Sequence, residues 1–364
     1  MQMLHIAIGT KAQFIKMSPV IKRLEESGIA FNLIDLGQHA MITRELRKEF
    51  GLKSPSVSVC PGRNVSSIFQ GLVWMARIFW MSLSPRWIKE TVFMNRRGIC
   101  LIHGDTVSTI MALYLAKRAG LKTAHIEAGL RSFDLLEPFP EEILRLIVMR
   151  HSDILFAPSK WALSNLDKMG LSARAVPLAA NTSLETTVQS LNRNTPADVG
   201  AEKYCLVTVH RMENIFSAKR LALLADFMGD ISRSLRVVFI QHPPTVRRLE
   251  KSGLCKRIKD NPNIRLFSII SHSHFIGLVA GAEFVITDGG SIQEECFYLD
   301  KPCLLLRNRT ERMEGIGENV SVSQFKKENM RRFYADYKSY RRKSAIDMLA
   351  KPSEEIIDYL ARSG

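Results

Sequence analysis

The chain has 364 residues, of which 46% are hydrophobic and 24% are charged. This composition is typical of a globular protein of about two domains, and it excludes a disordered tail, a collagen and a coiled-coil rod. Lysine and arginine number 51 against 36 aspartate and glutamate, which gives a net charge of +15 and indicates an acidic partner such as a phosphate, a nucleic acid or an anionic membrane surface.

In the first half, short apolar runs alternate with longer amphipathic segments. The runs predict strands over 4–9, 31–36, 99–103, 123–126 and 154–157, and the segments between them predict helices over 14–26, 41–50, 107–119, 141–150 and 160–168. A polar, turn-rich stretch over 181–200 interrupts this alternation. We therefore place the domain boundary between residues 172 and 200, with domains over 1–172 and 173–349.

The alternation resumes in the second half. Strands are predicted over 204–209, 237–241, 264–267, 284–287 and 303–306, with helices over 218–233, 245–252, 274–280 and 292–298. Continuous apolar strands separated by helices predict parallel sheets covered on both faces, which is an α/β, doubly wound architecture. Two such Rossmann-like domains leave an interdomain cleft at the carboxyl ends of their strands, where open α/β sheets bind ligands.

Cysteine usage and hydropathy bear on the compartment. The six cysteines are scattered without a CxxC pair, so we expect neither a disulfide framework nor a structural zinc site. The first nine residues are too short and too uncharged for a signal peptide. No apolar stretch reaches about 18 residues, and the nearest candidate, 71–83, is interrupted by Arg77. We expect a reduced, cytoplasmic protein without a membrane span.

A basic segment follows the last predicted strand. Residues 326–343 carry eight basic and two acidic side chains, interleaved with the aromatic residues Phe333, Tyr334, Tyr337 and Tyr340. We expect a solvated helix whose aromatic side chains pack on the body of the protein, and contact with an anionic surface is the alternative. No nucleic-acid-binding module is recognisable, so we predict no nucleic-acid partner.

Polar motifs follow the predicted strands of the first half. The stretch 9–16 opens a helix, where backbone N–H groups together with Lys11 and Lys16 suit an anion, and an ordinary loop with solvated lysines is the alternative. Asp105 follows the strand over 99–103 within the tetrapeptide His-Gly-Asp-Thr. That place suits a catalytic acid, although aspartate also commonly caps a helix there.

The densest motif of the first half contains two carboxylates. Glu127 ends a predicted strand, and Glu141 opens the next predicted helix with Arg145 four residues later on the same face. Paired carboxylates divide acid and base roles when their environments separate their pKa values. Stabilisation of the helix N-terminus is the alternative role for Glu141.

Three further motifs follow strands of the second half. His210 ends the strand over 204–209 and is suited to donate to a phosphate oxygen. Gly289, Gly290 and Ser291 start a helix, where glycine lets the backbone approach a diphosphate closely, and Glu295 on its first turns suits sugar hydroxyls. Arg312 follows the next strand, either as a ligand contact or as a brace for its loop.

Taken together and in order, these motifs resemble the UDP-N-acetylglucosamine 2-epimerase family. The stretches that carry the resemblance are 9–21, 103–106, 125–131, 138–145, 210–214, 287–295 and 310–314. The hydrolysing branch of the family typically has a GTRADYG start and an NSSSGI-like loop, and neither occurs in this sequence. With Ile292-Gln293-Glu294-Glu295 in the nucleotide loop, the chain resembles the non-hydrolysing branch. The resemblance runs from residue 5 to about 320.

The resemblance implies a fold like that of GT-B glycosyltransferases, with a last helix over 350–364 that packs back on the first domain. It implies an isomerase without cofactor or metal, whose UDP-sugar reacts by loss of UDP from C1, proton removal at C2 and re-addition of UDP. Implied catalytic residues are Lys16, Asp105, Glu127, Glu141 and His210. Implied substrate-binding residues are Lys11, Arg145, Phe275, Gly289, Gly290, Ser291, Glu295 and Arg312.

Departures from the family pattern bear on the substrate. Lys11 stands where the family has arginine, which exchanges a planar fork for a point charge, and Gln13 stands in place of glutamate. The resemblance implies inversion of UDP-GlcNAc to UDP-ManNAc for surface polysaccharide synthesis, by a homodimer. A 2,3-diacetamido sugar nucleotide is an alternative substrate, and a GT-B glycosyltransferase at the membrane face, with peripheral lipid contact, is an alternative function.

Overall fold

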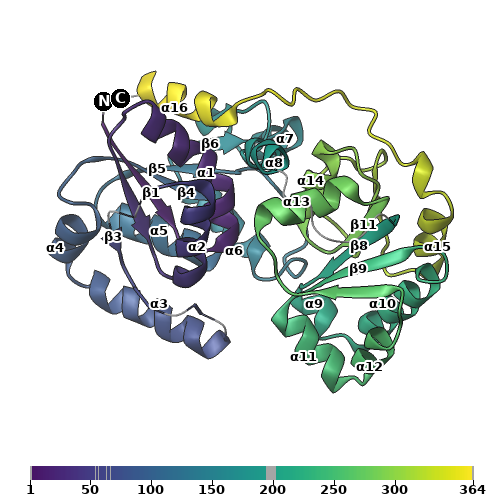
Figure 1. Cartoon of the computed structure of the whole chain (residues 1–364). Helices are drawn as coiled ribbons and strands as arrows, with labels where there is room; N and C mark the ends of the chain where they lie inside the picture. Colours follow the sequence, from purple (N-terminus) through teal and green to yellow (C-terminus); the bar gives the residue numbers. More distant parts are fainter. Residues whose placement is uncertain are drawn as a thin grey trace. The chain divides into compact units, whose positions relative to one another are not determined.

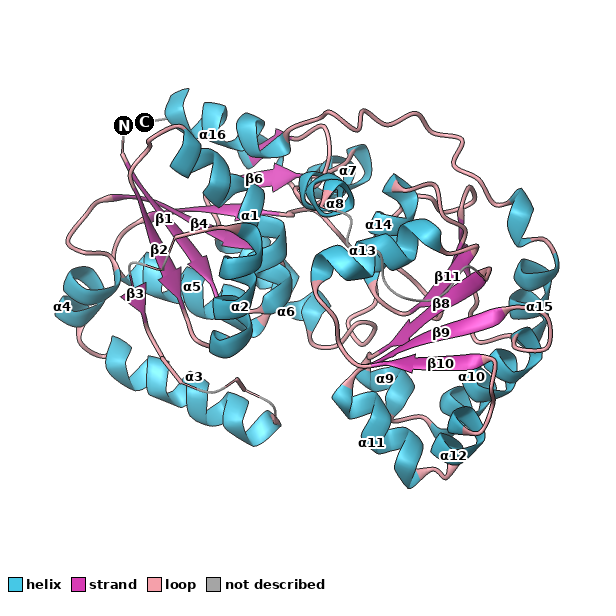
Figure 2. Ribbon diagram, viewed as in Figure 1, coloured by secondary structure: helices cyan, strands magenta, loops and turns pink. Residues whose placement is uncertain are grey.

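The computed structural model describes residues 2–53, 55, 57–62, 64–65, 67–193 and 202–362. The chain divides into two compact units, Met1–Thr186 with Leu349–Gly364, and Thr187–Met348. Each unit is built on one sheet in which neighbouring strands are parallel (Figure 1, Figure 2). The predicted α/β class with two doubly wound, Rossmann-like domains is therefore confirmed.

The sheet of the first unit has the strand order β3-β2-β1-β4-β5-β6-β7. Its strands are β1 (Met3–Ile8), β2 (Phe31–Asp35), β3 (Val57–Ser58), β4 (Gly98–His103), β5 (Lys122–Ile126), β6 (Ile154–Ala157) and β7 (Ala175–Pro177). The chain reverses its direction of strand addition between β1 and β4, and open sheets of this type bind ligands at such a point.

Helices connect these strands. They are α1 (Lys11–Glu26), α2 (Ala40–Phe50), α3 (Ile68–Ser82), α4 (Pro85–Trp87), α5 (Val107–Arg118), α6 (Glu141–His151), α7 (Lys160–Lys168), α8 (Ser183–Asn192) and α16 (Pro352–Arg362), with the π-helical turn η1 (Ile88–Val92) and the 3-10 turn η2 (Ser172–Arg174). The helix α8 crosses from the first unit into the second.

The sheet of the second unit has the order β10-β9-β8-β11-β12-β13, so its reversal lies between β8 and β11. Its strands are β8 (Tyr204–Val209), β9 (Arg236–Gln241), β10 (Ile264–Phe267), β11 (Phe284–Thr287), β12 (Cys303–Leu305) and β13 (Val320–Val322). Its helices are α9 (Met212–Ile215), α10 (Ala218–Ile231), α11 (Pro243–Lys251), α12 (Leu254–Lys259), α13 (His272–Gly281), α14 (Gly290–Tyr298) and α15 (Lys327–Ala335), with the 3-10 turn η3 (Tyr337–Ser339).

All ten predicted strands are present, and three more were not predicted. The additional strands β3, β7 and β13 have two or three residues each and lie at sheet edges, so they are too short to show a hydrophobic pattern. The helix α3 was also missed. Its sequence is apolar on nearly all sides, which removes the one-sided period that predicts a surface helix.

The unit boundary, between Thr186 and Thr187, lies within the expected stretch of 172–200 and later than the first domain's limit at residue 172. The strand β7 pairs in parallel with β6 of the first sheet, and this pairing holds the chain in the first unit up to Thr186. The C-terminal return begins at Leu349. On α16, Ile356 and Leu360 are buried in the same core as Phe14 and Met17 of α1, so the last helix packs on the first unit.

The basic segment over 326–343 is a helix only in its first half. The helix α15 ends at Ala335, and a 3-10 turn follows. Phe333 is fully buried, and Tyr334, Tyr337 and Tyr340 pack against the core of the second unit. The predicted packing of the aromatic side chains is therefore confirmed, whereas the expected helix is shorter.

Candidate functional site

The loop from β1 into α1 is held by a buried network around Gln13. Thr10 caps α1 and Gln13 completes a capping box, in which each side chain satisfies a backbone N–H of the first turn. The Nε2 of Gln13 donates to the carbonyl of His103 at 2.9 Å and to Oγ1 of Thr109 at 2.8 Å. The side-chain amide therefore joins the ends of β1 and β4. An ionised carboxylate at residue 13 could not make these two bonds, because it has no hydrogen to donate.

A buried ion pair lies at the end of β5. Nζ of Lys16 donates to Oε2 of Glu127, and the two side chains are only 4% and 5% exposed. Nδ2 of Asn181 donates to the same oxygen at 2.5 Å. Two donors on one oxygen favour the ionised carboxylate.

The backbone of this turn is unusual. Glu127 has a φ of 72°, a left-handed conformation that costs a residue other than glycine on the order of 1–3 kcal/mol. Gly129 follows with a φ of 89°, and a Cβ there would lie 2.2 Å from the carbonyl oxygen of Ala162. The close approach of α7 thus requires glycine, and the strained turn aims the Glu127 carboxylate at Lys16.

Two buried histidines flank this carboxylate. Nε2 of His103 lies 3.8 Å from Oε2 of Glu127, and a ring nitrogen of His125 is 2.8 Å from the carbonyl oxygen of Gly104. Burial lowers the pKa of each histidine from 6.5 to about 4, because a charged imidazolium is poorly solvated there. Both rings are therefore neutral at pH 7.

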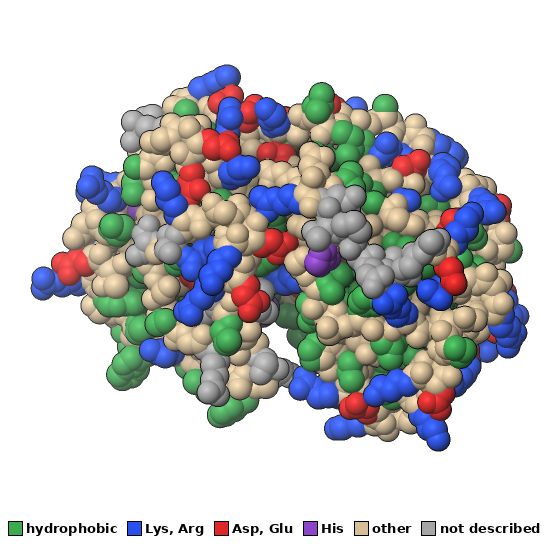
Figure 3. All heavy atoms as spheres, viewed as in Figure 1, with side chains coloured by type: hydrophobic (Ala, Val, Ile, Leu, Met, Phe, Trp, Pro, Cys, Tyr) green, Lys and Arg blue, Asp and Glu red, His purple; other side chains and the backbone are tan. Residues whose placement is uncertain are grey.

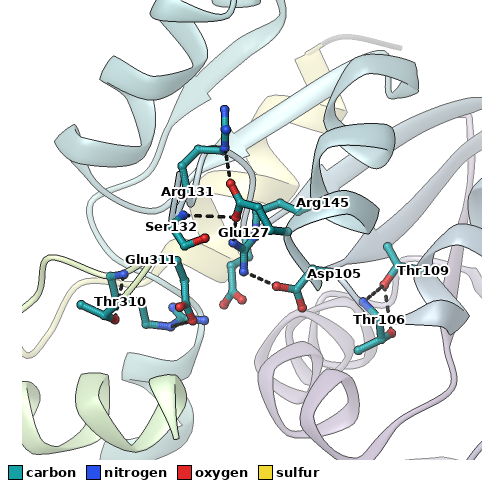
Figure 4. Close-up of polar contacts among 12 residues, drawn as sticks. Asp105, Thr106, Thr109, Glu127, Arg131, Ser132, Arg145, Thr310 and Glu311 are labelled. Carbon is teal, nitrogen blue, oxygen red and sulfur yellow. Dashed lines mark hydrogen bonds and ion pairs between the residues drawn. The ribbon is translucent and has the colours of Figure 1, made fainter. Parts of the chain in front are cut away.

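A second charged cluster joins β4 to α6 (Figure 4). Nη2 of Arg145 donates to Oδ2 of Asp105, and Nη1 donates to Oε2 of Glu142 at 2.6 Å. Glu142 is fully buried and also accepts from Nε of Arg131 at 2.5 Å and from the backbone N–H of Ser132 at 3.1 Å. Asp105 retains 21% side-chain exposure, so it is the member of this cluster that solvent reaches best.

Two predicted residues of the first unit lie at helix starts. Glu141 is the first residue of α6 and is half-buried, which matches both a role in acid–base chemistry and stabilisation of the helix end. Lys11 is the first residue of α1, and its backbone N–H donates to Nδ1 of His39 at 3.2 Å.

In the second unit, the loop after β8 is tied to the loop after β11 by Asp288. This buried carboxylate accepts from the backbone N–H groups of His210 at 3.1 Å and of Arg211 at 2.9 Å, and from Nδ2 of Asn214 at 2.9 Å. The side chain of His210 remains 39% exposed, and its ring lies beside that of His242 with centroids 4.7 Å apart. The network fixes the His210 backbone and leaves its ring accessible.

The glycine turn after β11 starts α14. Gly289 occupies the N-cap position of α14, and Ser291 is the second residue of this helix. A Cβ on Gly290 would lie 2.7 Å from Oε1 of Glu311 and 3.0 Å from Nε of Arg312, so the turn and the loop after β12 pack too closely for a larger residue. The first four backbone N–H groups of a helix have no partner within it, and they can attract an anion because the helix dipole is positive there.

Glu295 is buried within α14. Its Oε1 lies 3.1 Å from Nε2 of His272, whose Nδ1 is 2.9 Å from Oγ of Ser190. Oε2 of Glu295 has no hydrogen-bond partner among the described residues, so this oxygen is available to a ligand hydroxyl. Phe275 is partly buried on α13, one turn after His272.

Arg312 braces the loop after β12. Its Nη1 donates to Oε1 of Glu294, and its backbone N–H donates to Oγ1 of Thr310 at 3.2 Å. The side chain is 4% exposed. The bracing alternative for Arg312 thus has direct contacts in the structure.

Comparison with known proteins identifies the family. A family model described as UDP-N-acetylglucosamine 2-epimerase matches residues 22–353. The chain belongs to the UDP-N-acetylglucosamine 2-epimerase family. Members of this family are isomerases, so the predicted enzyme class is confirmed.

Individual epimerases match over nearly the whole chain. The UDP-N-acetylglucosamine 2-epimerase of Methanococcus maripaludis is 32% identical over 88% of this chain and 87% of its own. The UDP-2,3-diacetamido-2,3-dideoxy-D-glucuronate 2-epimerase of Pseudomonas aeruginosa is 28% identical over 86% of each chain. The crystal structure of the Methanocaldococcus jannaschii UDP-GlcNAc 2-epimerase in complex with UDP-GlcNAc and UDP aligns with a TM-score of 0.83 at 26% identity, covering 99% of this chain and 100% of that one.

Several residues that contact the candidate site residues were not selected from the sequence. Asn181 lies in the polar stretch that marked the domain boundary, and nothing in its spacing links it to Glu127. His103 was part of a recognised motif but was not selected, and Glu142 was passed over in favour of its neighbour Glu141. A fully buried carboxylate next to a half-buried one on a helix has no distinct pattern in the sequence.

Proposed function

We propose that this protein inverts C2 of a UDP-N-acetylhexosamine, converting UDP-GlcNAc to UDP-ManNAc without hydrolysis. The observation that carries the proposal is the buried Glu127 carboxylate, which accepts from Lys16 and Asn181 at the end of β5, together with the Asp105–Arg145 pair at the end of β4. Two carboxylates at neighbouring strand ends supply the two proton-transfer positions that inversion at C2 needs.

The proposed reaction proceeds by elimination and re-addition. The bond between C1 and the UDP oxygen breaks, a carboxylate takes the proton from C2, and a C1–C2 double bond forms in a 2-acetamidoglucal. A proton then adds to C2 from the opposite face, and the UDP oxygen bonds to C1 again. Asp105, Glu127 and Glu141 are the candidates for the two proton transfers, and Lys16 holds Glu127 ionised.

We assign the nucleotide to the second unit. The start of α14 at Gly289, Gly290 and Ser291 offers backbone N–H groups to the diphosphate, and the exposed ring of His210 adds a donor for the leaving UDP. Oε2 of Glu295 suits the hydroxyls of the ribose. Phe275 on α13 is proposed to contact the same nucleotide.

In this proposal Arg145 and Arg312 hold neighbouring side chains in place, whereas Lys11 contacts the substrate. Arg145 holds Asp105 and Glu142 in place, and Arg312 is held by Glu294, so both shape the loops that contact the substrate. Lys11 at the start of α1 supplies a cation to the diphosphate.

A second substrate remains a candidate because of one relative. The Pseudomonas aeruginosa protein that is 28% identical acts, by its name, on a 2,3-diacetamido sugar nucleotide. This chain also departs from the family arginine at Lys11, which replaces a planar fork with a point charge among the proposed substrate contacts. The glycosyltransferase alternative receives no support from the family model or from the relatives named above, which are epimerases by name.

Incubation with UDP-GlcNAc in deuterated water tests the proposal. We expect UDP-ManNAc that carries deuterium at C2, with UDP still attached at equilibrium, measured by NMR and mass spectrometry. Free UDP and free sugar as the only products would contradict the non-hydrolysing reaction, and absence of exchange with any UDP-N-acetylhexosamine would contradict epimerisation. A parallel assay with the 2,3-diacetamido nucleotide decides between the two substrates.

Asp105→Asn tests the chemistry of one residue. We expect the exchange rate to fall by about 10²–10⁴-fold, with UDP affinity retained because the nucleotide is assigned to the other unit. Asp153→Asn is the matched control, because Asp153 accepts from Nζ of Lys117 at 2.6 Å and lies just before β6, at the amino end of that strand. Equal rates in the two variants would reduce Asp105 to a structural partner of Arg145.

The resemblance also implies a homodimer, which we retain as part of the proposal. Light scattering of the purified chain measures the mass in solution. A monomer at micromolar concentration would contradict this state.

A further inference from the structure

The interior of the second unit has a more distinctive polar feature than the surface. Charged side chains of both signs are spread over the face of the molecule drawn in Figure 3, and none of the helices within the described parts of the chain has the length and apolarity to cross a membrane. Inside the second unit, Ser190 on α8, His272 on α13 and Glu295 on α14 form one hydrogen-bonded row. Their exposed fractions are only 1%, 6% and 6%, and polar groups are buried at a cost that such bonds must offset.

The carboxylate of Glu295 decides where the ring of His272 carries its hydrogen. Nε2 of the ring lies 3.1 Å from Oε1 of Glu295, and Nδ1 lies 2.9 Å from Oγ of Ser190. An ionised carboxylate only accepts hydrogen bonds, so Nε2 must carry a hydrogen and donate it. In the neutral ring, Nδ1 then accepts from the Ser190 hydroxyl, which rotates to suit. The ring is therefore held at both of its nitrogens.

The row differs from the serine, histidine and carboxylate triad of hydrolases. In such triads Nε2 of the histidine faces the serine and Nδ1 faces the carboxylate, whereas in this protein the two nitrogens have exchanged partners. A nucleophilic hydroxyl must also reach a substrate, and Ser190 is almost inaccessible. The row is therefore suited to hold a side chain in place and not to attack a substrate.

The helices on both sides of the contact between His272 and Glu295 are themselves fixed. The side chain of Ser271 caps the start of α13, and Nε2 of Gln293 on α14 donates to the carbonyl of Arg312 at 3.1 Å. With both helices held, the rotation of the terminal carboxylate is the softest remaining freedom of Glu295, because such sp³–sp² torsions have broad minima. A hydrogen bond to Oε1 restricts that rotation.

We propose that His272 positions Glu295 so that its Oε2 faces the ribose hydroxyls of the nucleotide, with Ser190 orienting the histidine ring. Oε2 is buried and has no hydrogen-bond partner among the described residues, which is the state expected of an acceptor that a ligand completes. A carboxylate already held at Oε1 loses little further freedom when a hydroxyl binds, and this favours affinity. His272 is thus a positioning residue, and the proposal rests on the assignment of the nucleotide to the second unit.

Calorimetry with two nucleotides tests this role, because UDP carries both ribose hydroxyls and 2′,3′-dideoxy-UDP carries neither. His272→Leu should weaken UDP binding at least about tenfold, which is the size expected for loss of a hydrogen bond to a charged group, and should leave dideoxy-UDP binding unchanged. His272→Gln, whose Nε2 can donate to Oε1 of Glu295, should restore most of the preference for UDP. Ser190→Ala should weaken UDP binding about threefold, since it removes a neutral partner of the ring.

His274→Leu is the matched control for His272→Leu. His274 lies two residues later on α13, about 200° around the helix, so this variant should bind both nucleotides as the natural protein does. Retained binding of dideoxy-UDP by His272→Leu shows that this variant is folded. If His272→Leu does not fold, Ser190→Ala, which removes a single oxygen atom, gives the same comparison.

The two nucleotides also separate failure of this proposal from failure of the proposed function. Equal losses for UDP and dideoxy-UDP in His272→Leu would reveal a merely structural role and overturn the proposal, and so would an unchanged preference for UDP. Equal affinity of the natural protein for the two nucleotides would overturn it as well, because Glu295 would then not contact the hydroxyls. Exchange at C2 in deuterated water reports on the epimerase reaction separately, and it can succeed while any of these results contradicts the role of His272.

Discussion

Glu127→Gln separates the two roles of the buried ion pair, its contribution to stability and its chemistry. The substitution keeps the size of the side chain and the hydrogen bond from Asn181, but it removes the negative charge next to Nζ of Lys16. Both side chains of the native pair are nearly inaccessible to solvent. The ammonium group is then held in a poorly solvated place without its carboxylate.

The expected loss of stability follows from that burial. Removing one partner of a buried ion pair costs up to about 3–5 kcal/mol. For a unit of this size, a loss of that magnitude lowers the melting temperature by roughly 6–20 °C. Independently of stability, the loss of proton transfer should lower the C2 exchange rate by about 10²–10⁴-fold.

A second substitution distinguishes these effects. Lys16→Met combined with Glu127→Gln removes both charges, and replacing a buried pair by neutral side chains is often nearly neutral for stability. We expect thermal unfolding, followed by circular dichroism, to return close to that of the natural protein, while exchange in deuterated water stays low. A single variant as stable as the natural protein, or a double variant that recovers turnover, would refute the reasoning.

Three further predictions concern buried groups. Gln13→Glu replaces an amide that donates to the His103 carbonyl with a carboxylate, and we expect urea unfolding to show a loss of about 1–3 kcal/mol; an unchanged midpoint would argue against the network. Burial lowers the pKa values of His103 and His125 from 6.5 to about 4, so between these two pH values the unfolded chain binds protons that the folded chain does not. The free energy of unfolding should therefore fall as the pH drops from about 6.5 to about 4, by up to about 3 kcal/mol for each ring. Urea titrations at pH 7 and pH 5 measure this fall, and equal stability at the two values would contradict it. Gly290→Ala places a Cβ 2.7 Å from Oε1 of Glu311, and we expect this overpacking to lower the free energy of unfolding by about 1–3 kcal/mol. Calorimetry should also show weaker UDP binding. Unaltered UDP binding would show that the turn tolerates a side chain.

The sequence by itself determined the architecture and the strand ends at which most candidate site residues lie. Ten strands were visible because buried parallel strands are continuous apolar runs, and polar residues directly after such runs must meet at the carboxyl edge of the sheet. For this reason Asp105, Glu127 and His210 could be selected before any contact was known. Strands of two or three residues, such as β3 and β7, carry too few residues to show a period.

Only the tertiary structure decided which side chains meet. Asn181 donates to Glu127 across 54 positions of sequence. Arg145 donates to both Asp105 and Glu142, two partners that its spacing from Glu141 did not indicate. The exposure of one face of α3 could not be predicted from the sequence either. A helix that is apolar on both sides has the same composition whether one side or both sides are buried. Periodicity reports which residues share a face, but pairing and exposure depend on what folds against that face, and that is set by contacts between segments far apart in the chain.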